Sequence, residues 1–308
     1  MLALASASAL AGLLDTEIAF AWPVTPACPC RYSDLFQRIG GLRVENPMPG
    51  GHRKRVVTSG WNPVRIFKGF SSTLDTKVEE ADFYYKMIRA LRAFRYSDDV
   101  REKMSECTAI RRGDTHLALH TRRTDRFRFH RTVYRHQLSA FSIVRNTGMI
   151  KSLQYLLLPE SWVRGIENHY LGKLLEGFLS AYPDATYTLY ADSETEIEDL
   201  QQFINTAGMM DSRHYPAFCR RSADGRRGPF GMRDVHPRDA LVDLLEMSTS
   251  DRIAQNNPAS TFSLVAAMIG RVQIISKQPT HAFWRRMQAV LKKPPNEIVT
   301  DQHETLSD

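Results

Sequence analysis

Apolar and polar positions alternate in blocks along the second half of the chain, and these blocks predict an α/β fold. Short apolar runs that suit buried strands are separated by longer amphipathic stretches that suit helices. Strands are predicted at 116–121, 185–191, 252–255 and 272–276, and helices at 160–182, 193–203, 238–247 and 259–269. Because alternating strands and helices build parallel sheets covered on both faces, we expect such a sheet here.

The first half shows a less regular pattern. Helices are predicted at 2–14, 79–94 and 97–108, strands at 18–22, 55–58 and 64–67, and a short helical turn at 32–36. Gly and Pro are frequent between residues 40 and 63, which indicates connecting segments with short strands. Residues 126–160 show no firm periodicity and are either a substrate-facing loop or an irregular insertion.

These patterns predict two domains followed by a tail. The first domain covers residues 1–113 and the second covers 114–278, and each is expected to be built on a parallel sheet. Residues 279–308 are expected to form one more amphipathic helix, at 279–292, and a frayed polar end.

Composition narrows the range of partners. A formal charge of +7 over 308 residues favours an anionic partner, which leaves a nucleotide, a nucleic acid, an acidic glycan or a membrane surface open. Nucleic acid is less favoured, because no basic stripe interleaved with stacking aromatics is found. No stretch is long enough to cross a bilayer, and residues 1–15 lack the basic start of a signal peptide.

The four cysteines do not predict a metal site or a disulfide scaffold. They are too few for a disulfide framework, and their spacing does not match a zinc-ligand motif. They are Cys28, Cys30, Cys107 and Cys219. Cellular compartment therefore stays open on this ground.

The strand at 116–121 leads into a cluster of charged residues, His120-Thr-Arg122-Arg123-Thr-Asp125. Open α/β sheets bind phosphates at the carboxyl ends of their strands, and Arg side chains bind them with forked hydrogen bonds. Because successive side chains alternate faces, one arginine would clamp a pyrophosphate while the other pairs with Asp125 or lines the acceptor side. The alternative is an exposed turn with an ordinary salt bridge.

Two later segments add candidate binding residues. Asp192 follows the strand at 185–191, and Ser260 opens the predicted helix at 259–269. Asp239 and Asp243 lie one turn apart on the helix at 238–247, so both carboxylates share one face. The alternatives are an N-cap role for Asp192 and for Ser260 and a helix-start charge for Asp239.

His120-Thr-Arg122-Arg123-Thr-Asp125 resembles the His-x-Arg-Arg-x-Asp signature of the α1,6-fucosyltransferases, with the protein O-fucosyltransferases as more distant relatives. The segments around Asp192 and from Asp239 to Ser263 are similar to later motifs of the same family. The resemblance implies a GT-B fold of two Rossmann-like domains, with 1–113 on the acceptor side and 114–278 binding the nucleotide sugar.

The same resemblance implies the site residues. It implies Arg122 and Arg123 as catalytic residues and a donor-binding set of His120, Arg122, Asp125, Asp192, Asp243, Ser260, Thr261 and Phe262. Asp243 would accept hydrogen bonds from a guanine edge, and Ser260 and Thr261 would meet phosphates at a helix N-terminus.

The implied reaction is transfer of fucose from GDP-fucose to a glycan or glycoprotein acceptor, with inversion and without a metal or other cofactor. The general base is open, with Asp125, His130 and Glu17 conceivable. Family members work in the secretory pathway (Golgi or ER) in eukaryotes and in the cytoplasm in bacteria.

The sequence departs from the family at its start. Relatives begin with a strand and a Gly-rich loop before a helix like the one at 2–14, whereas this sequence begins inside that helix. Either these elements were lost or the true start lies upstream, and the first domain is expected to be truncated. Loss of the anion-binding loop would favour an inactive relative that binds a nucleotide or a glycan.

Overall fold

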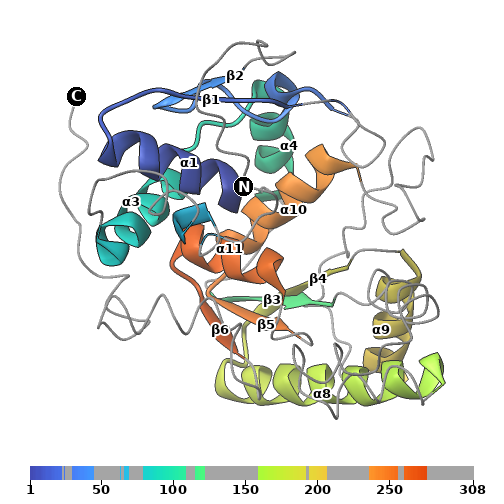
Figure 1. The fold of residues 1–308 in the computed structure, drawn as a ribbon. Coiled ribbons are helices and arrows are strands. Elements are labelled where there is room, and N and C mark those ends of the chain that lie inside the picture. The colour runs from blue at the N-terminus through green and yellow to red at the C-terminus, as the bar shows by residue number, and fades with distance from the viewer. Residues whose placement is uncertain are drawn as a thin grey trace.

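The structure is a computed structural model that describes residues 1–22, 24, 30–44, 63, 66–68, 79–108, 115–121, 159–191, 194–206, 236–255 and 260–275. Figure 1 shows a parallel sheet with helices on both sides. The helices are α1 (Leu2–Leu13), α3 (Glu80–Arg92), α4 (Asp98–Thr108), α8 (Glu160–Ala181), α9 (Glu194–Thr206), α10 (Pro237–Ser248) and α11 (Thr261–Gly270), with a 3₁₀ turn η1 (Tyr32–Asp34). The strands are β1 (Ile18–Phe20), β2 (Leu42–Val44), β3 (His116–His120), β4 (Thr186–Tyr190), β5 (Arg252–Gln255) and β6 (Gln273–Ile275).

The second half of the chain folds as the sequence predicts. Its four strands form one sheet in the order β4-β3-β5-β6, and every neighbouring pair is parallel. The helices and strands predicted from residue 116 onward that the structure describes are all present, with ends shifted by a few residues. The expectation of an α/β fold with parallel sheets is therefore confirmed.

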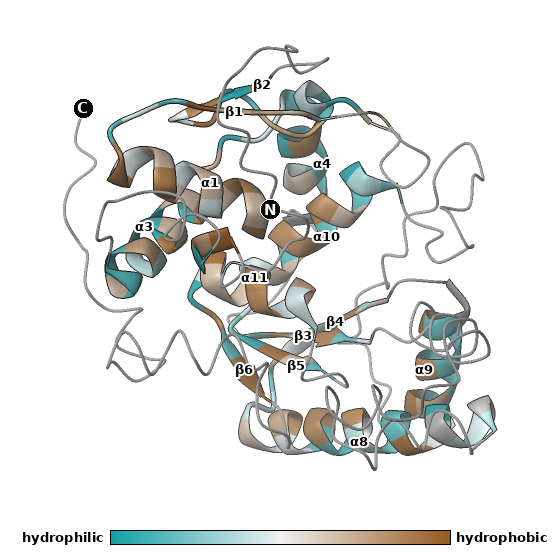
Figure 2. Cartoon of the chain, viewed as in Figure 1, coloured by the Kyte–Doolittle hydropathy of each residue, from teal (hydrophilic) through white to brown (hydrophobic). Residues whose placement is uncertain are grey.

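The two faces of this sheet belong to different groups of helices. Leu117 and Leu119 pack with buried residues of α8 and α9, whereas Ala118 packs with residues of α10 and α11. This alternation follows from the two-residue period of a strand. Figure 2 shows the strands, in which brown segments alternate with paler and teal ones, between α11 on one side and α8 on the other. Because both faces are covered, the whole of β3 is buried.

The first half contains one strand at a place that the sequence did not predict and one predicted strand that is wrong. Strand β2 pairs in parallel with β1, so that a second, two-stranded sheet forms beside α1. The strand expected at 64–67 is wrong, because Ile66 and Phe67 are helical. Pro63 and Ile66 are both buried, and a spacing of three residues buries one face of a helix. The strand expected at 55–58 lies outside the described residues.

One core connects the two halves of the described chain. Buried residues of α1 and α3 belong to the same cluster as those of α10 and α11. Arg92 of α3 donates from Nε to the carbonyl oxygen of Met268 on α11, over 3.0 Å. The domain boundary at 113/114, the GT-B arrangement and the truncated first domain stay predictions.

Close packing between α10 and α11 depends on a glycine. A Cβ atom at Gly270 would collide with the carbonyl group of Ser248, so only glycine fits where these helices end side by side. Arg271 then ends α11 in the left-handed conformation, with φ of 61°.

Two predicted segments are not described. The predicted helix at 279–292 lies outside the described residues, and so does nearly all of the segment at 126–160. Among the helices that the structure describes, none combines the length and apolar character that crossing a membrane requires.

Candidate functional site

The carboxyl edge of the four-stranded sheet carries a row of three polar side chains. His120 ends β3, and its register partners are Tyr190 at the end of β4 and Gln255 at the end of β5. Paired residues of neighbouring strands point to the same face of a sheet, here the face covered by α11. All three are buried. Such an edge is where open α/β sheets bind their ligands.

His120 is held by the first turn of α11. Its Nδ1 atom lies 2.5 Å from the hydroxyl oxygen of Ser263, and its ring stacks on Phe262 with 5.3 Å between centroids. A hydrogen bond at one ring nitrogen decides which tautomer the histidine adopts. The end of β3 and the start of α11, far apart in the sequence, are thereby fixed against each other.

Ser260 lies at the N-terminus of α11 but does not cap it with its side chain. Its backbone has the extended N-cap conformation, with φ −70° and ψ 114°, and the side chain makes no capping hydrogen bond. Ser260 is only 2% exposed, and its hydroxyl oxygen has no hydrogen-bond partner in the structure described. The simple N-cap alternative does not account for this side chain.

The start of α11 therefore has the features of an anion site. The first N–H groups of a helix have no partner within the helix, and the positive end of the helix dipole lies there. Thr261 begins the helix and Phe262 follows it, so both belong to the same turn as Ser260 and Ser263.

Gln255 is a candidate that sequence reasoning missed. It is 2% exposed, and its Oε1 atom has no hydrogen-bond partner in the structure described. The only signal in the sequence is a long polar side chain at the end of the otherwise apolar run Ile253-Ala254. The register of β3 and β5 places Gln255 beside His120, and this position makes Gln255 a candidate site residue.

Asp243 lies on the neighbouring helix α10, which packs against α11. It is buried, as are Asp239 and Glu246. Spacings of four, three and seven residues put the three acids on one face of α10, which confirms the expected shared face of Asp239 and Asp243.

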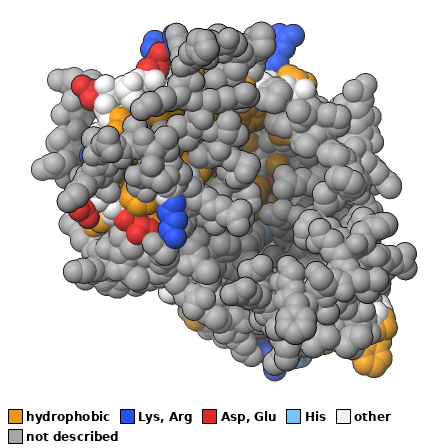
Figure 3. Space-filling view, in the orientation of Figure 1, with side chains coloured by type: hydrophobic (Ala, Val, Ile, Leu, Met, Phe, Trp, Pro, Cys, Tyr) orange, Lys and Arg blue, Asp and Glu red, His pale blue; other side chains and the backbone are white. Residues whose placement is uncertain are grey.

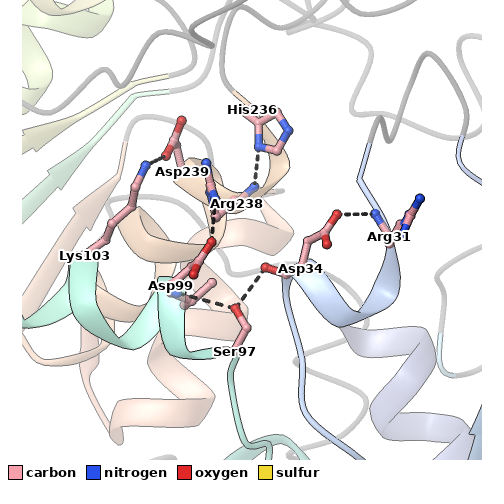
Figure 4. Close-up of polar contacts among 9 residues, drawn as sticks. Arg31, Asp34, Ser97, Asp99, Lys103, His236, Arg238 and Asp239 are labelled. Atoms are coloured by element: carbon pink, nitrogen blue, oxygen red, sulfur yellow. Dashed lines mark hydrogen bonds and ion pairs between the residues drawn. The ribbon is translucent and has the colours of Figure 1, made fainter.

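Two ion pairs join the start of α10 to α4. Figure 4 shows Asp99 and Lys103 of α4 facing Arg238 and Asp239 of α10. Arg238 Nη1 lies 2.9 Å from Asp99 Oδ2, and Lys103 Nζ lies 2.7 Å from Asp239 Oδ1. The charges alternate in sign along both helices, so each pairing also disfavours a shifted register. We call these two ion pairs the α4–α10 clamp.

The clamp is tied further to the N-terminal segment. Ser97 donates a hydrogen bond from Oγ to the carbonyl oxygen of Asp34, over 2.9 Å, and its Oγ accepts one from the backbone N–H of Val100. His236 caps α10, since its Nδ1 accepts from the backbone N–H of Arg238 at 3.2 Å (Figure 4). The position of Asp243 therefore depends on contacts with the first half of the chain.

Four of the candidate residues belong to the part of the sequence outside the described ranges. Arg122, Arg123, Asp125 and Asp192 lie outside the described residues. The chain leaves β3 through Thr121, whose N–H donates to the carbonyl oxygen of Tyr190 over 2.8 Å.

Within the described ranges, no group of three or more His, Cys, Asp or Glu side chains is arranged to hold a metal ion.

Charge on the described surface is mixed. Figure 3 shows acidic and basic side chains close together over α3 on the face that it draws. The net positive charge of the sequence is therefore not gathered into one basic patch on the described part of this face.

Comparison with known proteins finds likeness in structure but not in sequence. No family model and no curated protein matches the chain. NodZ alpha-1,6-fucosyltransferase co-crystallized with GDP is 14% identical over 90% of each chain, with a TM-score of 0.45. Fucosyltransferase NodZ from Bradyrhizobium is 13% identical over 90% of this chain and 91% of its own, with a TM-score of 0.46.

POFUT1 in complex with GDP-fucose is 13% identical over 64% of this chain and 49% of its own, with a TM-score of 0.35. At these scores the likeness is distant, and it assigns neither a family nor an activity to the chain.

Proposed function

We propose that this protein is a glycosyltransferase of the fucosyltransferase kind, with GDP-fucose as donor and a glycan or glycoprotein as acceptor. The observation that carries the proposal is the buried, unpartnered hydroxyl of Ser260 at the N-terminus of α11, beside the edge where β3 ends in His120. A diphosphate fits there because it accepts hydrogen bonds from helix N–H groups and from a hydroxyl.

The motif at the end of β3 supplies the chemistry in this proposal. As the donor is cleaved, positive charge develops on the anomeric carbon and negative charge on the departing phosphate. Arg122, with Arg123 beside it, would neutralise that phosphate, and His120 and Asp125 would complete the donor contacts. Transfer would then invert the anomeric centre and need no metal ion.

Recognition of the base is assigned to α10. Asp243 is buried on the helix next to α11, and a carboxylate accepts hydrogen bonds from the N–H groups of a guanine edge. Phe262 stacks on His120 and so keeps the first turn of α11 close to the strand end, where the diphosphate would lie. Asp192, two positions after the last residue of β4, is assigned to the same donor site.

Calorimetry tests the donor. We expect the full chain to bind GDP, and to bind ADP and UDP at least tenfold more weakly, because a carboxylate at Asp243 can pair with the adjacent N1–H and N2–H donors of guanine, a pair that adenine and uracil lack. Equal affinity for the three nucleotides, or no binding of GDP, would refute the donor assignment.

A matched pair of serine variants tests the site. Ser260→Ala removes a donor to the phosphate and should weaken GDP binding about tenfold or more. Ser250→Ala is the control, because Ser250 is also buried with an unpartnered hydroxyl but lies at the amino end of β5. If both variants bind GDP as the native chain does, the diphosphate does not lie at α11.

Two further measurements address the reaction. Arg122→Ala should slow fucose transfer about a hundredfold or more, whereas Arg128→Ala should leave it nearly unchanged. Transfer should also proceed at the same rate with and without EDTA. Loss of activity on chelation would contradict the metal-independent chemistry.

A further inference from the structure

Two buried polar side chains without a hydrogen-bond partner in the structure described lie near the two ends of strand β5, Gln255 as its last residue and Ser250 two positions before its first. At the carboxyl end, Gln255 Oε1 is buried with no hydrogen-bond partner in the structure described; just before the amino end, the same holds for the hydroxyl of Ser250. A buried polar atom without a partner lowers the stability of the folded state. Only the atom at the carboxyl end lies where a ligand is proposed to bind.

The surroundings of Gln255 do not satisfy its acceptor. Its register neighbour His120 points to the same face of the sheet, but the Nδ1 atom of His120 is already engaged by Ser263. Ser260, which opens the helix that follows β5, also keeps its hydroxyl without a partner. Two orphaned polar atoms thus flank the same strand-to-helix connection.

The chemistry of the two atoms differs, and the difference defines the ligand. A serine hydroxyl donates to a phosphate oxygen, whereas an amide oxygen only accepts and makes no hydrogen bond to a phosphate oxygen. A ligand that satisfies both atoms therefore carries an anionic group at Ser260 and a hydrogen-bond donor at Gln255. A sugar joined to a phosphate has both, because its ring hydroxyls lie next to the phosphate.

We propose that Gln255 accepts a hydrogen bond from a sugar hydroxyl of the bound nucleotide sugar, next to the diphosphate at Ser260. The inference rests on the proposed function and adds a specificity residue to it. Gln255 would favour sugar-bearing phosphates over bare phosphates and over ligands whose hydroxyl is missing, because a buried acceptor rejects a ligand that leaves it unsatisfied.

The test replaces Gln255 by methionine, which keeps the length of the side chain and removes the acceptor. Gln255→Met should bind GDP-fucose about tenfold more weakly than the native chain, whereas its affinity for inorganic pyrophosphate should not change. Its melting temperature without ligand should be equal to or higher than that of the native chain, because the substitution removes a buried acceptor that has no hydrogen-bond partner.

Ser250→Ala serves as the matched control. It also removes a buried unpartnered polar atom beside β5, so its melting temperature should behave in the same way, but its affinity for GDP-fucose should stay at the native value. Gln255→Asn withdraws the amide by one methylene and should weaken GDP-fucose binding as methionine does, which provides a second variant if the first is unstable.

The outcomes separate this inference from the proposed function. If the native chain does not bind GDP-fucose, the proposed function fails. If the native chain binds it and Gln255→Met binds it equally well, only the role of Gln255 is refuted. Equal losses of affinity for GDP-fucose and pyrophosphate would also overturn that role, since they would indicate a general disturbance of the phosphate site.

Discussion

Replacing Lys103 in the α4–α10 clamp should lower the free energy of unfolding much more than replacing its partner Asp239. Lys103 Nζ and Asp239 Oδ1 are 2.7 Å apart, and the two side chains are 35% and 8% exposed. Removing Lys103 leaves a nearly buried carboxylate without this partner. Removing Asp239 leaves an ammonium group that can turn toward water.

The magnitudes follow from that difference. Coulomb's law at an effective dielectric constant of about 20 gives an attraction of about 6 kcal/mol at this distance. Desolvation of Asp239 offsets most of it, and the exposure of Lys103 reduces the rest. We expect Lys103→Met to lower the free energy of unfolding by about 3 kcal/mol and Asp239→Leu to lower it by about 1 kcal/mol.

Urea unfolding of a double-mutant cycle measures this directly. The Lys103→Met/Asp239→Leu chain should be more stable than Lys103→Met alone, with a coupling energy of about 2 kcal/mol. Arg101→Met provides the control, because Arg101 and Asp98 form an ion pair on α4 with side chains 62% and 82% exposed. That change should alter stability by less than about 0.5 kcal/mol.

Two results would contradict the argument. Equal destabilisation by Lys103→Met and Asp239→Leu would mean that Asp239 is not effectively buried in solution. Additive single effects in the double variant would mean that the two side chains do not interact. Asp243 lies on α10, so if the clamp holds this helix in place, Lys103→Met should also weaken GDP binding. Arg101→Met should leave GDP binding unchanged.

Three more predictions concern packing and pH. Burial raises the pKa of Tyr96, whose hydroxyl has no partner in the structure described. The unfolded phenol therefore loses its proton at lower pH than the folded one, and stability falls as pH rises above about 10. Tyr96→Phe should lose less stability than the native chain between pH 9 and 11, as measured by thermal melts. Gly270→Ala should lower the free energy of unfolding by about 3 kcal/mol, because the added methyl collides with Ser248, and equal urea midpoints would contradict this. Arg164→Met should cost about 3 kcal/mol, because Arg164 Nη1 lies 2.6 Å from a carboxylate oxygen of the fully buried Glu196; a loss below 1 kcal/mol in urea unfolding would count against it.

Much of the fold was predictable because its signals are local. Strands β3, β4 and β5 are short apolar runs between amphipathic helices, and parallel pairing follows from that alternation alone. The helix spanning 66–68 shows the limit of such signals. Ile66 and Phe67 have high strand propensity, yet both are helical in the structure. In this helix Ile66 packs in the core and Phe67 packs against Phe83 of α3.

By itself, the sequence determined which residues can do chemistry and on which elements most of them lie. His120 at a strand end and Ser260 at a helix start follow from hydrophobic period and position. Only the tertiary structure decided that His120, Phe262 and Ser263 touch, that Ser260 does not cap its helix, and that Gln255 lies in their row. The reason is that hydrophobic period is set by neighbours in the chain, whereas the contact of His120 with Ser263 joins residues 143 positions apart, which only the folded chain brings together.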